Sequence, residues 1–278
     1  MESSKSILPV EICAQIAQHA RMSDLPALAR VSKPLQVLAE TRLYQHIVMR
    51  DPPSVYRISI SLLARDHQRA LYVKRLWVYQ DHRASRSPWP EDLWDVVRKV
   101  LNALHNLESA YLYDESSTNT WLFDPARIPF QLREANLGFH WDDALMSFLE
   151  GQKDLQVLTL QMPEDDEITH RTLSRDALPK VELFDGPLFV ALDLRFRPLR
   201  RLNIRVDEET VPLFSIYLAE LALVNRTLRS LNVQNVPEYL VADSLRVLAS
   251  SPLAESMRYL GILNLPAAEV RCHHLWSR

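Results

Sequence analysis

The sequence is poor in residues on which several protein classes depend. Its 278 residues include four glycines and two cysteines, and no window approaches eighteen uninterrupted apolar residues. So few glycines leave no Gly-rich loop of the kind that cradles phosphates. Cys13 and Cys272 lie in very different neighbourhoods, so a disulfide framework is not expected. The missing apolar run argues against a membrane protein, and a formal net charge of -3 gives no general attraction to nucleic acid or anionic lipid.

Catalytic constellations are also missing from the sequence. There is no nucleophile elbow and no Cys-x-x-Cys pair. The sequence Cys272-His273-His274 is crowded by adjacency and lacks a second ligand pair for a metal. We therefore expect no enzyme activity, no metal site and no cofactor.

The remaining composition is that of an ordinary globular protein. Apolar residues make up 47% of the chain and charged residues 24%, which predicts a sizeable core. The first residues, Met-Glu-Ser-Ser-Lys-Ser, lack the long apolar stretch of a secretory signal. We expect a cytoplasmic and/or nuclear protein with no nucleic-acid or membrane partner.

Three short amphipathic helices are predicted within the first fifty residues. Pro9 suits a first helical position, Ser23 and Asp24 can cap a second helix, and Pro34 can open a third. A unit of about forty residues is close to the lower limit of independent stability, so surplus apolar surface here needs a partner to cover it. The predicted apolar positions are Leu8, Ile12 and Ile16 on the first helix, Leu25, Leu28 and Val31 on the second, and Leu35 and Leu38 on the third.

Residues 8 to 47 resemble an F-box. The resemblance is carried by Leu8-Pro9-Val10-Glu11-Ile12, Ile16, Leu28-x-x-Val31-Ser32-Lys33 and a closing Leu43-Tyr44. It implies a unit that docks on the Skp adaptor of a cullin-based ubiquitin ligase. The alternative is an ordinary helical cap on the segment that follows. The adaptor-binding side chains implied by the resemblance are Leu8, Pro9, Ile12, Ile16, Leu25, Leu28, Val31 and Leu38.

After residue 70, short Leu-x-x-Leu-x-Leu segments alternate with helix-like stretches. Helices are predicted over 90–105 and 211–225, the second burying Leu213, Ile216, Tyr217, Leu221 and Val224. One strand and one helix per period resembles the irregular leucine-rich repeats that often follow an F-box. The asparagine or cysteine expected at the ninth position is absent. The segments, spaced mostly by about 20 to 29 residues, begin at Val73, Leu107, Leu132, Leu155, Leu178, Leu199, Leu228 and Met257.

The predicted fold class is therefore α/β, with a three-helix F-box over residues 1–50 and a leucine-rich-repeat-like solenoid over 51–278. If the fourth and sixth positions of each segment face the core, the third, fifth and seventh line the concave face of the sheet. Exposed Trp, Tyr and Arg are the side chains that most often anchor protein partners. The predicted target-binding residues are Arg75, Trp77, Tyr79, Tyr111 and Tyr113, with Arg201 and Arg205 further along the sheet.

The aromatic residues and the arginines of this face each have an alternative interpretation. Trp77 and Tyr111 form a satellite core if the loops that follow their strands cover them. An arginine cluster is most simply a solvated face, although arginines also bind acidic or phosphorylated segments through bidentate pairs. The cluster consists of Arg195, Arg197, Arg200, Arg201 and Arg205.

The resemblance implies a substrate-recognition subunit of a cullin-based (SCF-type) ubiquitin ligase. The N-terminal helices then bind the Skp adaptor, and the repeat domain binds a target protein. The alternative is a leucine-rich-repeat interaction scaffold unconnected to ubiquitination, in which the first helices only cap the solenoid.

Overall fold

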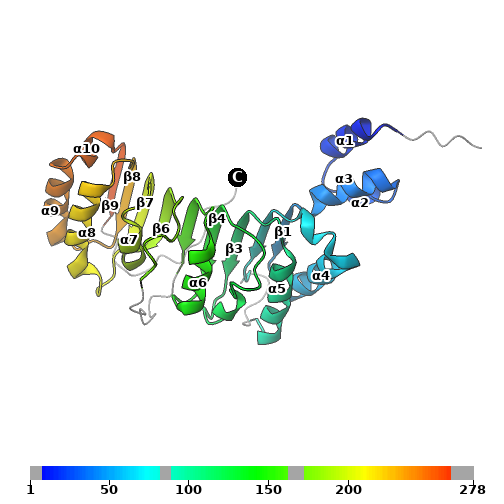
Figure 1. Ribbon diagram of the computed structural model, residues 1–278, viewed down its shortest axis with the longest axis horizontal. Helices are drawn as coiled ribbons and strands as arrows, with labels where there is room; N and C mark the ends of the chain where they lie inside the picture. The colour runs from blue at the N-terminus through cyan, green and yellow to red at the C-terminus, as the bar shows by residue number, and fades with distance from the viewer. Residues whose placement is uncertain (1–7, 82–88, 162–171, 264–278) are drawn as a thin grey trace, which may run out of the picture. The chain divides into compact units, whose positions relative to one another are not determined.

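The structure is a computed structural model that describes residues 8–81, 89–161 and 172–263 (Figure 1). It contains two compact units, residues 1–132 and 133–278. Within each unit, strands and helices alternate, and neighbouring strands pair in chain order and in parallel. The predicted α/β class is confirmed. The domain boundary expected at residue 50 falls inside the first unit.

The first unit opens with three helices, α1 (Val10–His19), α2 (Leu25–Leu28) and α3 (Lys33–Tyr44). α2 is a single turn, shorter than predicted, so Val31 lies beyond its end. The Ser32 hydroxyl caps α3 by accepting a hydrogen bond from the Leu35 amide. Arg42 of α3 donates to the Ala17 and Ala20 carbonyls at the end of α1 and ties the two helices together. The buried apolar side chains of these helices are Cys13, Ala17, Leu25, Leu35 and Ala39.

Three parallel strands follow in the first unit, namely β1 (His46–Met49), β2 (Arg75–Val78) and β3 (Ser109–Tyr113). Two helices of this unit, α4 (Pro52–Leu63) and α5 (Glu91–Ala103), pack on each other. Short 3-10 turns lie at η1 (Arg65–His67), η2 (Ala70–Tyr72) and η3 (Thr120–Leu122). α5 agrees with the predicted helix over 90–105. β1 and α4 were not predicted, although Asp51 and Ser54 form a capping box at the start of α4.

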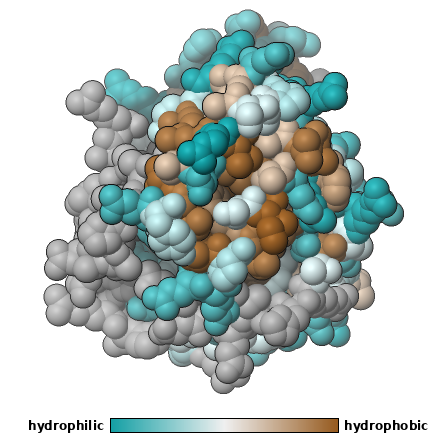
Figure 2. Space-filling model, turned by 90° about the vertical axis from the view of Figure 1, so that its left-hand side faces the viewer, coloured by the Kyte–Doolittle hydropathy of each residue, from teal (hydrophilic) through white to brown (hydrophobic). Residues whose placement is uncertain are grey.

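The described residues of the second unit form six parallel strands, β4 (Glu134–Gly138), β5 (Val157–Leu160), β6 (Leu183–Pro187), β7 (Arg201–Arg205), β8 (Ser230–Gln234) and β9 (Tyr259–Leu263). Its helices are α6 (Asp143–Gly151), α7 (Leu188–Leu194), α8 (Val211–Val224), α9 (Glu238–Ala249) and α10 (Leu253–Ser256). Figure 2 looks onto the end of this unit at β9, α9 and α10, where Leu245, Tyr259 and Leu260 are exposed.

One predicted repeat start is wrong. The other predicted segments begin two residues before a strand, but β6 starts at Leu183, so its repeat begins at Val181 and not at Leu178. Leu178 has a φ of 52° and precedes Pro179, and the backbone turns there instead of entering the sheet. The leucine spacing alone did not reveal this shift of three residues.

Alternate strand residues face the core, as predicted. Leu158, Leu202 and Leu231 are completely buried at equivalent positions of β5, β7 and β8. In β6 the ring of Phe184 fills the space beside Gly186. A Cβ atom at residue 186 would lie 2.7 Å from the Phe184 Cζ atom.

The predicted buried face of α8 is partly wrong. Tyr217 and Leu221 are buried, but Leu213, Ile216 and Val224 are exposed. The helix buries Phe214, Leu218 and Ala222 instead. Because α8 is apolar on all sides, its sequence did not define which side faces the core.

Candidate functional site

An apolar stripe formed by α1 and the two residues before it remains exposed after the N-terminal helices have packed. Leu8 keeps 47% of its surface exposed, Ile12 42% and Ile16 38%. The helix buries Cys13 and Ala17, each one residue beyond an exposed isoleucine, and therefore turns the isoleucines outward. We call Leu8, Pro9, Ile12 and Ile16 the N-terminal apolar stripe; Pro9 is exposed as well.

The remaining predicted adaptor-binding residues lie in different environments. Val31 is 68% exposed, and Leu28 and Leu38 are half-buried. Leu25 is completely buried, so its side chain belongs to the core of the first unit and offers no surface to a partner. Exposed apolar side chains that the sequence did not single out add to this surface, namely Val10, Met22 and Val37.

A polar cluster joins α3 to the segment that follows it. Arg69 donates hydrogen bonds to the Glu40 carboxylate at 2.8 Å and to the Ser61 hydroxyl at 2.9 Å. The Tyr44 and Ser61 hydroxyls are 2.6 Å apart, and the Arg69 guanidinium lies 5.2 Å from the centre of the Tyr44 ring. The hydrogen bond to Glu40 raises the pKa of Arg69. The N-terminal helices are thus fastened to α4 by directional contacts.

The predicted aromatic residues of β2 and β3 are brought together on the outward face of the sheet. Trp77 lies opposite Tyr111 in the parallel register, with ring centres 5.9 Å apart. Tyr79 meets Tyr111 edge to face at 5.8 Å. Trp77 keeps 37% of its surface exposed and is therefore not part of a closed satellite core. Arg75, at the start of β2, is exposed beside these rings.

His46 extends this cluster and was missed by sequence reasoning. Its ring meets Trp77 edge-on at a centroid distance of 4.9 Å. The pKa of His46 is lowered from its ordinary value, mainly by burial and to a smaller extent by the positive charge of Arg75. His46 belongs to β1, a strand of four residues that follows α3 almost directly, and no strand was predicted there. We call His46, Trp77, Tyr79, Tyr111 and Tyr113 the aromatic patch.

The outward face of the sheet in the second unit is polar. The Asn203 amide donates to the Asp185 carboxylate at 2.8 Å, and the Asn232 amide donates to the Asn203 side-chain oxygen at 2.8 Å. These side chains form a ladder across β6, β7 and β8. Of the predicted arginines on this face, Arg201 is exposed, and Arg205 donates to the Leu160 carbonyl.

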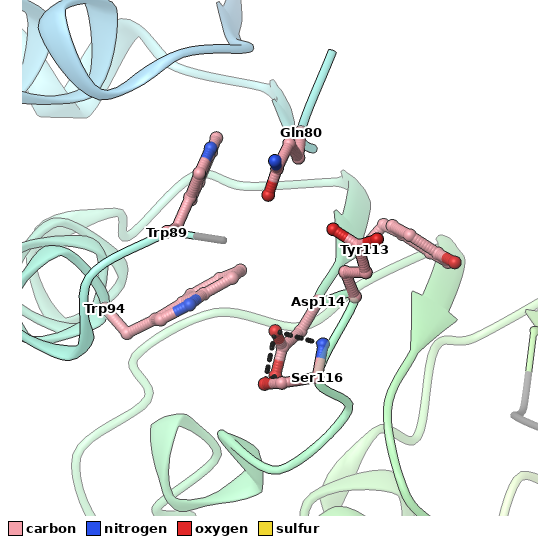
Figure 3. Close-up of a pocket in the computed structure, with 7 residues that line it drawn as sticks. Gln80, Trp89, Trp94, Tyr113, Asp114 and Ser116 are labelled. Atoms are coloured by element: carbon pink, nitrogen blue, oxygen red, sulfur yellow. Dashed lines mark hydrogen bonds between the residues drawn. The ribbon is translucent and has the colours of Figure 1, made fainter. Parts of the chain in front are cut away.

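A small pocket lies beyond β3 (Figure 3). Its volume of about 30 Å³ is room for about one water molecule. Trp89 and Trp94 form one side, with ring centres 5.3 Å apart. On the other side the Asp114 carboxylate accepts hydrogen bonds from Ser116 and Asn119. Asp114 therefore orders the loop after β3.

Residues 8–81, 89–161 and 172–263 contain neither a metal-binding cluster nor a membrane-spanning helix. No group of three or more His, Cys, Asp or Glu side chains there is placed to hold a metal ion. None of the helices in these ranges combines the length and the apolar character needed to cross a bilayer. Cys272, His273 and His274 lie outside the described residues.

Comparison with protein-family models found no matching family, and comparison with curated proteins found no match.

Proposed function

We propose that this chain is a binding protein that brings two partners together. The N-terminal apolar stripe docks on an adaptor protein, and the aromatic patch holds a target. On the F-box resemblance of residues 8 to 47, the adaptor is the Skp subunit of a cullin-based ubiquitin ligase. The chain is then the substrate-recognition subunit of that ligase.

The exposure of the N-terminal apolar stripe is the observation that carries this proposal. Leu8, Ile12 and Ile16 are each about two-fifths exposed, although Cys13 and Ala17 beside them are buried. Covering each of these side chains with a partner is worth about 1 kcal/mol. Exposing this apolar stripe to water is unfavourable, and an apolar stripe on a small helical module is the kind of surface that a partner helix covers.

The polar cluster around Arg69 supports a role in orientation. A substrate-recognition subunit supplies proximity: it raises the local concentration of the target near enzymes bound through the adaptor. Glu40 and Tyr44 of α3 contact Arg69 and Ser61, so the docking helices are fixed to α4, which packs against β1, the strand that carries His46 of the aromatic patch. A fixed junction orients the target more narrowly than a flexible linker does.

The aromatic patch supports target binding. Trp and Tyr provide large contact areas with few rotatable bonds, so ordering them costs little conformational entropy. Trp77 and Tyr79 both pack against the Tyr111 ring, so the three side chains are held in place before a partner arrives. A scaffold unconnected to ubiquitination could also bind a partner through this patch. In such a scaffold the first helices only cap the solenoid, and a cap needs a polar outer face. The apolar outer side of α1 favours the docking function.

Affinity for a purified Skp adaptor tests the proposal. We expect the full chain to bind the adaptor, and the Ile12→Ala/Ile16→Ala variant to bind at least about tenfold more weakly, since methylene groups are lost from the contact. The matched control is Ile60→Ala/Leu223→Ala, which shortens two aliphatic side chains that are 72% and 70% exposed on α4 and α8. Unmeasurable binding by the wild type, or equal weakening in both variants, contradicts the proposal.

A further inference from the structure

β9 is the last strand of the second unit, and among the described residues it pairs with β8 alone. The Tyr259 amide donates to the Arg229 carbonyl at 3.1 Å, so the backbone groups of Tyr259 face β8. Because successive residues of a strand alternate in direction, the N–H and C=O groups of Leu260 and Ile262 point away from β8. The free edge of β9 therefore presents these donors and acceptors to another strand.

The hydrophobic core is open at the same end of the unit. Leu260 occupies the position at which Leu202 and Leu231 are completely buried in β7 and β8, yet it keeps 37% of its surface exposed. Leu245 of α9 is 44% exposed, and Figure 2 shows apolar residues, in brown, gathered over this end. A strand that covers this end must therefore supply both backbone hydrogen-bonding groups and apolar surface.

The sequence of β9 lacks the features that usually protect a free edge. Edge strands are generally kept from pairing by charged side chains, by proline or by a bulge. The five residues from Tyr259 to Leu263 include no charged residue and no proline, and they pair with β8 in one continuous register. An edge of this kind is suited to pairing with another strand.

The positions of the free backbone groups match a second copy of the same strand. If two copies of β9 run antiparallel with Gly261 on the two-fold axis, Leu260 of each lies opposite Ile262 of the other, and each of these pairs exchanges two hydrogen bonds. The two Gly261 residues then form the non-hydrogen-bonded pair on the axis, where the Cα atoms approach to about 4.5 Å. Glycine brings no side chain to this close contact, and no two charged residues of β9 oppose each other.

We propose that β9 pairs antiparallel with β9 of a second copy of this chain and forms a two-fold symmetric dimer. The pairing gives the free edge groups of both strands their hydrogen-bond partners and brings apolar residues of each copy against the exposed Leu260 of the other. Because both copies use the same edge, the contact is closed and stops at two chains. The dimer goes beyond adaptor docking and does not depend on it, since it uses neither the N-terminal apolar stripe nor the aromatic patch.

A second copy covers this end more fully than a peptide strand from an unrelated protein does. Either one pairs with the backbone of β9, but a single peptide strand leaves its own outer edge free. The second copy uses its own free edge in the same contact, and its Leu245 and Leu260 add apolar surface there. One contact then removes two free edges and two open cores from water.

Sedimentation velocity of the full chain tests this dimer. We expect the weight-average mass to rise from 32.2 kDa toward twice that value as the concentration rises from about 1 to about 100 µM, since association follows mass action. Leu260→Pro removes the edge-facing amide, and Leu260→Lys places a charge within the apolar contact, so each should weaken dimerisation at least about tenfold. The control Leu260→Val keeps the amide and the apolar character. The control Leu223→Lys places the same charge at a leucine of α8 that is 70% exposed, and both controls should dimerise like the wild type.

Hydrogen exchange locates the contact within the dimer. The backbone amides of β9 should exchange more slowly at the higher concentration, whereas those of β7, which has a paired strand on both sides, should not change. Thermal melts show that each variant folds, and if Leu260→Pro does not, Leu260→Lys carries the test. The inference is overturned by a wild type that stays a single chain throughout, by association beyond two chains, by a dimer that survives in a folded Leu260→Lys variant, by equal weakening in Leu223→Lys, or by unchanged exchange in β9.

Discussion

The sheets of the two units share one backbone pattern but carry different chemistry on their outward faces. In the first unit the Lys74 carbonyl accepts hydrogen bonds from two successive amides of the next strand, and in the second the Arg200 carbonyl does the same. Both sheets bury aliphatic side chains at alternate positions. The first unit then presents the aromatic patch, whereas the second presents the amide ladder of Asp185, Asn203 and Asn232.

This difference separates what folding requires from what binding uses. Inward positions are restricted to apolar residues because they remove surface from water. Outward positions are free of that restriction, and so their side chains are available to suit a partner. In the second unit Asn203 donates to Asp185 and accepts from Asn232, whereas in the first unit Trp77 keeps 37% of its surface exposed. The first unit therefore has the outward surface better suited to apolar contact.

The largest expected effect is the loss of stability when a charge is placed on the buried face of β8, compared with a charge placed on its outward face. Leu231→Asp puts a carboxylate into a completely buried position, so the free energy of unfolding should fall by more than about 4 kcal/mol. Ser230→Asp, on the outward face opposite Arg201, should change it by less than about 1 kcal/mol. Urea denaturation measures both. Similar losses would place these residues on the wrong faces.

Removing one aromatic anchor should show which sheet carries target binding. Trp77→Ala should cost about 2 kcal/mol of binding free energy or more, about thirtyfold in affinity, whereas Asn203→Ala on the amide ladder should cost much less. Proximity labelling compares the neighbours of each variant with those of the wild type. We expect Trp77→Ala alone to lose specific neighbours while keeping its thermal melt. Loss in Asn203→Ala alone would move target binding to the second unit.

A smaller effect is expected from filling the space beside Phe184. Gly186→Ala places a Cβ atom 2.7 Å from the Phe184 Cζ atom and should destabilise the second unit by about 1 to 2 kcal/mol. Phe184→Leu removes the clashing atom, so the double variant should lose less than the sum of the two single changes. A double-mutant cycle of unfolding free energies measures this coupling. Strict additivity would show that the ring moves aside freely.

The smallest expected effect is a pH dependence confined to the aromatic patch. The lowered pKa of His46 means that the unfolded chain binds a proton more readily than the folded chain does. The contribution of His46 to stability is therefore present at neutral pH and is lost as the pH falls below about 6.5 through the lowered pKa. His46→Gln should flatten the change in unfolding free energy between pH 7 and 5, whereas Asn232→Gln should leave that slope unchanged. An unaltered slope in His46→Gln would contradict this.

Much of the aromatic patch was predictable from the sequence. Alternation in short apolar segments is set by the strand repeat of two, so Trp77 and Tyr111 were correctly placed outward and in register. The helix over 90–105 was predicted because its apolar residues fall on one broad side. His46 was missed because its strand is too short to show a clear alternation.

Arg200, Arg229 and Arg258 share the second position of the predicted segments that begin at Leu199, Leu228 and Met257, but the sequence did not show that the three strands pair directly with one another. The error at Leu178 had a related cause, because a leucine in a turn and a leucine in a strand look alike until backbone pairing distinguishes them. Burial of Leu25 likewise depends on how the first helices meet.

Hydrogen exchange with and without a purified Skp adaptor tests the central claim most directly, namely that the N-terminal apolar stripe is a docking surface. We predict that the adaptor slows exchange of the backbone amides in α1, the helix that carries Ile12 and Ile16, and leaves β7, β8 and β9 unchanged. Unchanged exchange throughout α1 at saturating adaptor, or slowing confined to the strands of the second unit, would contradict the claim.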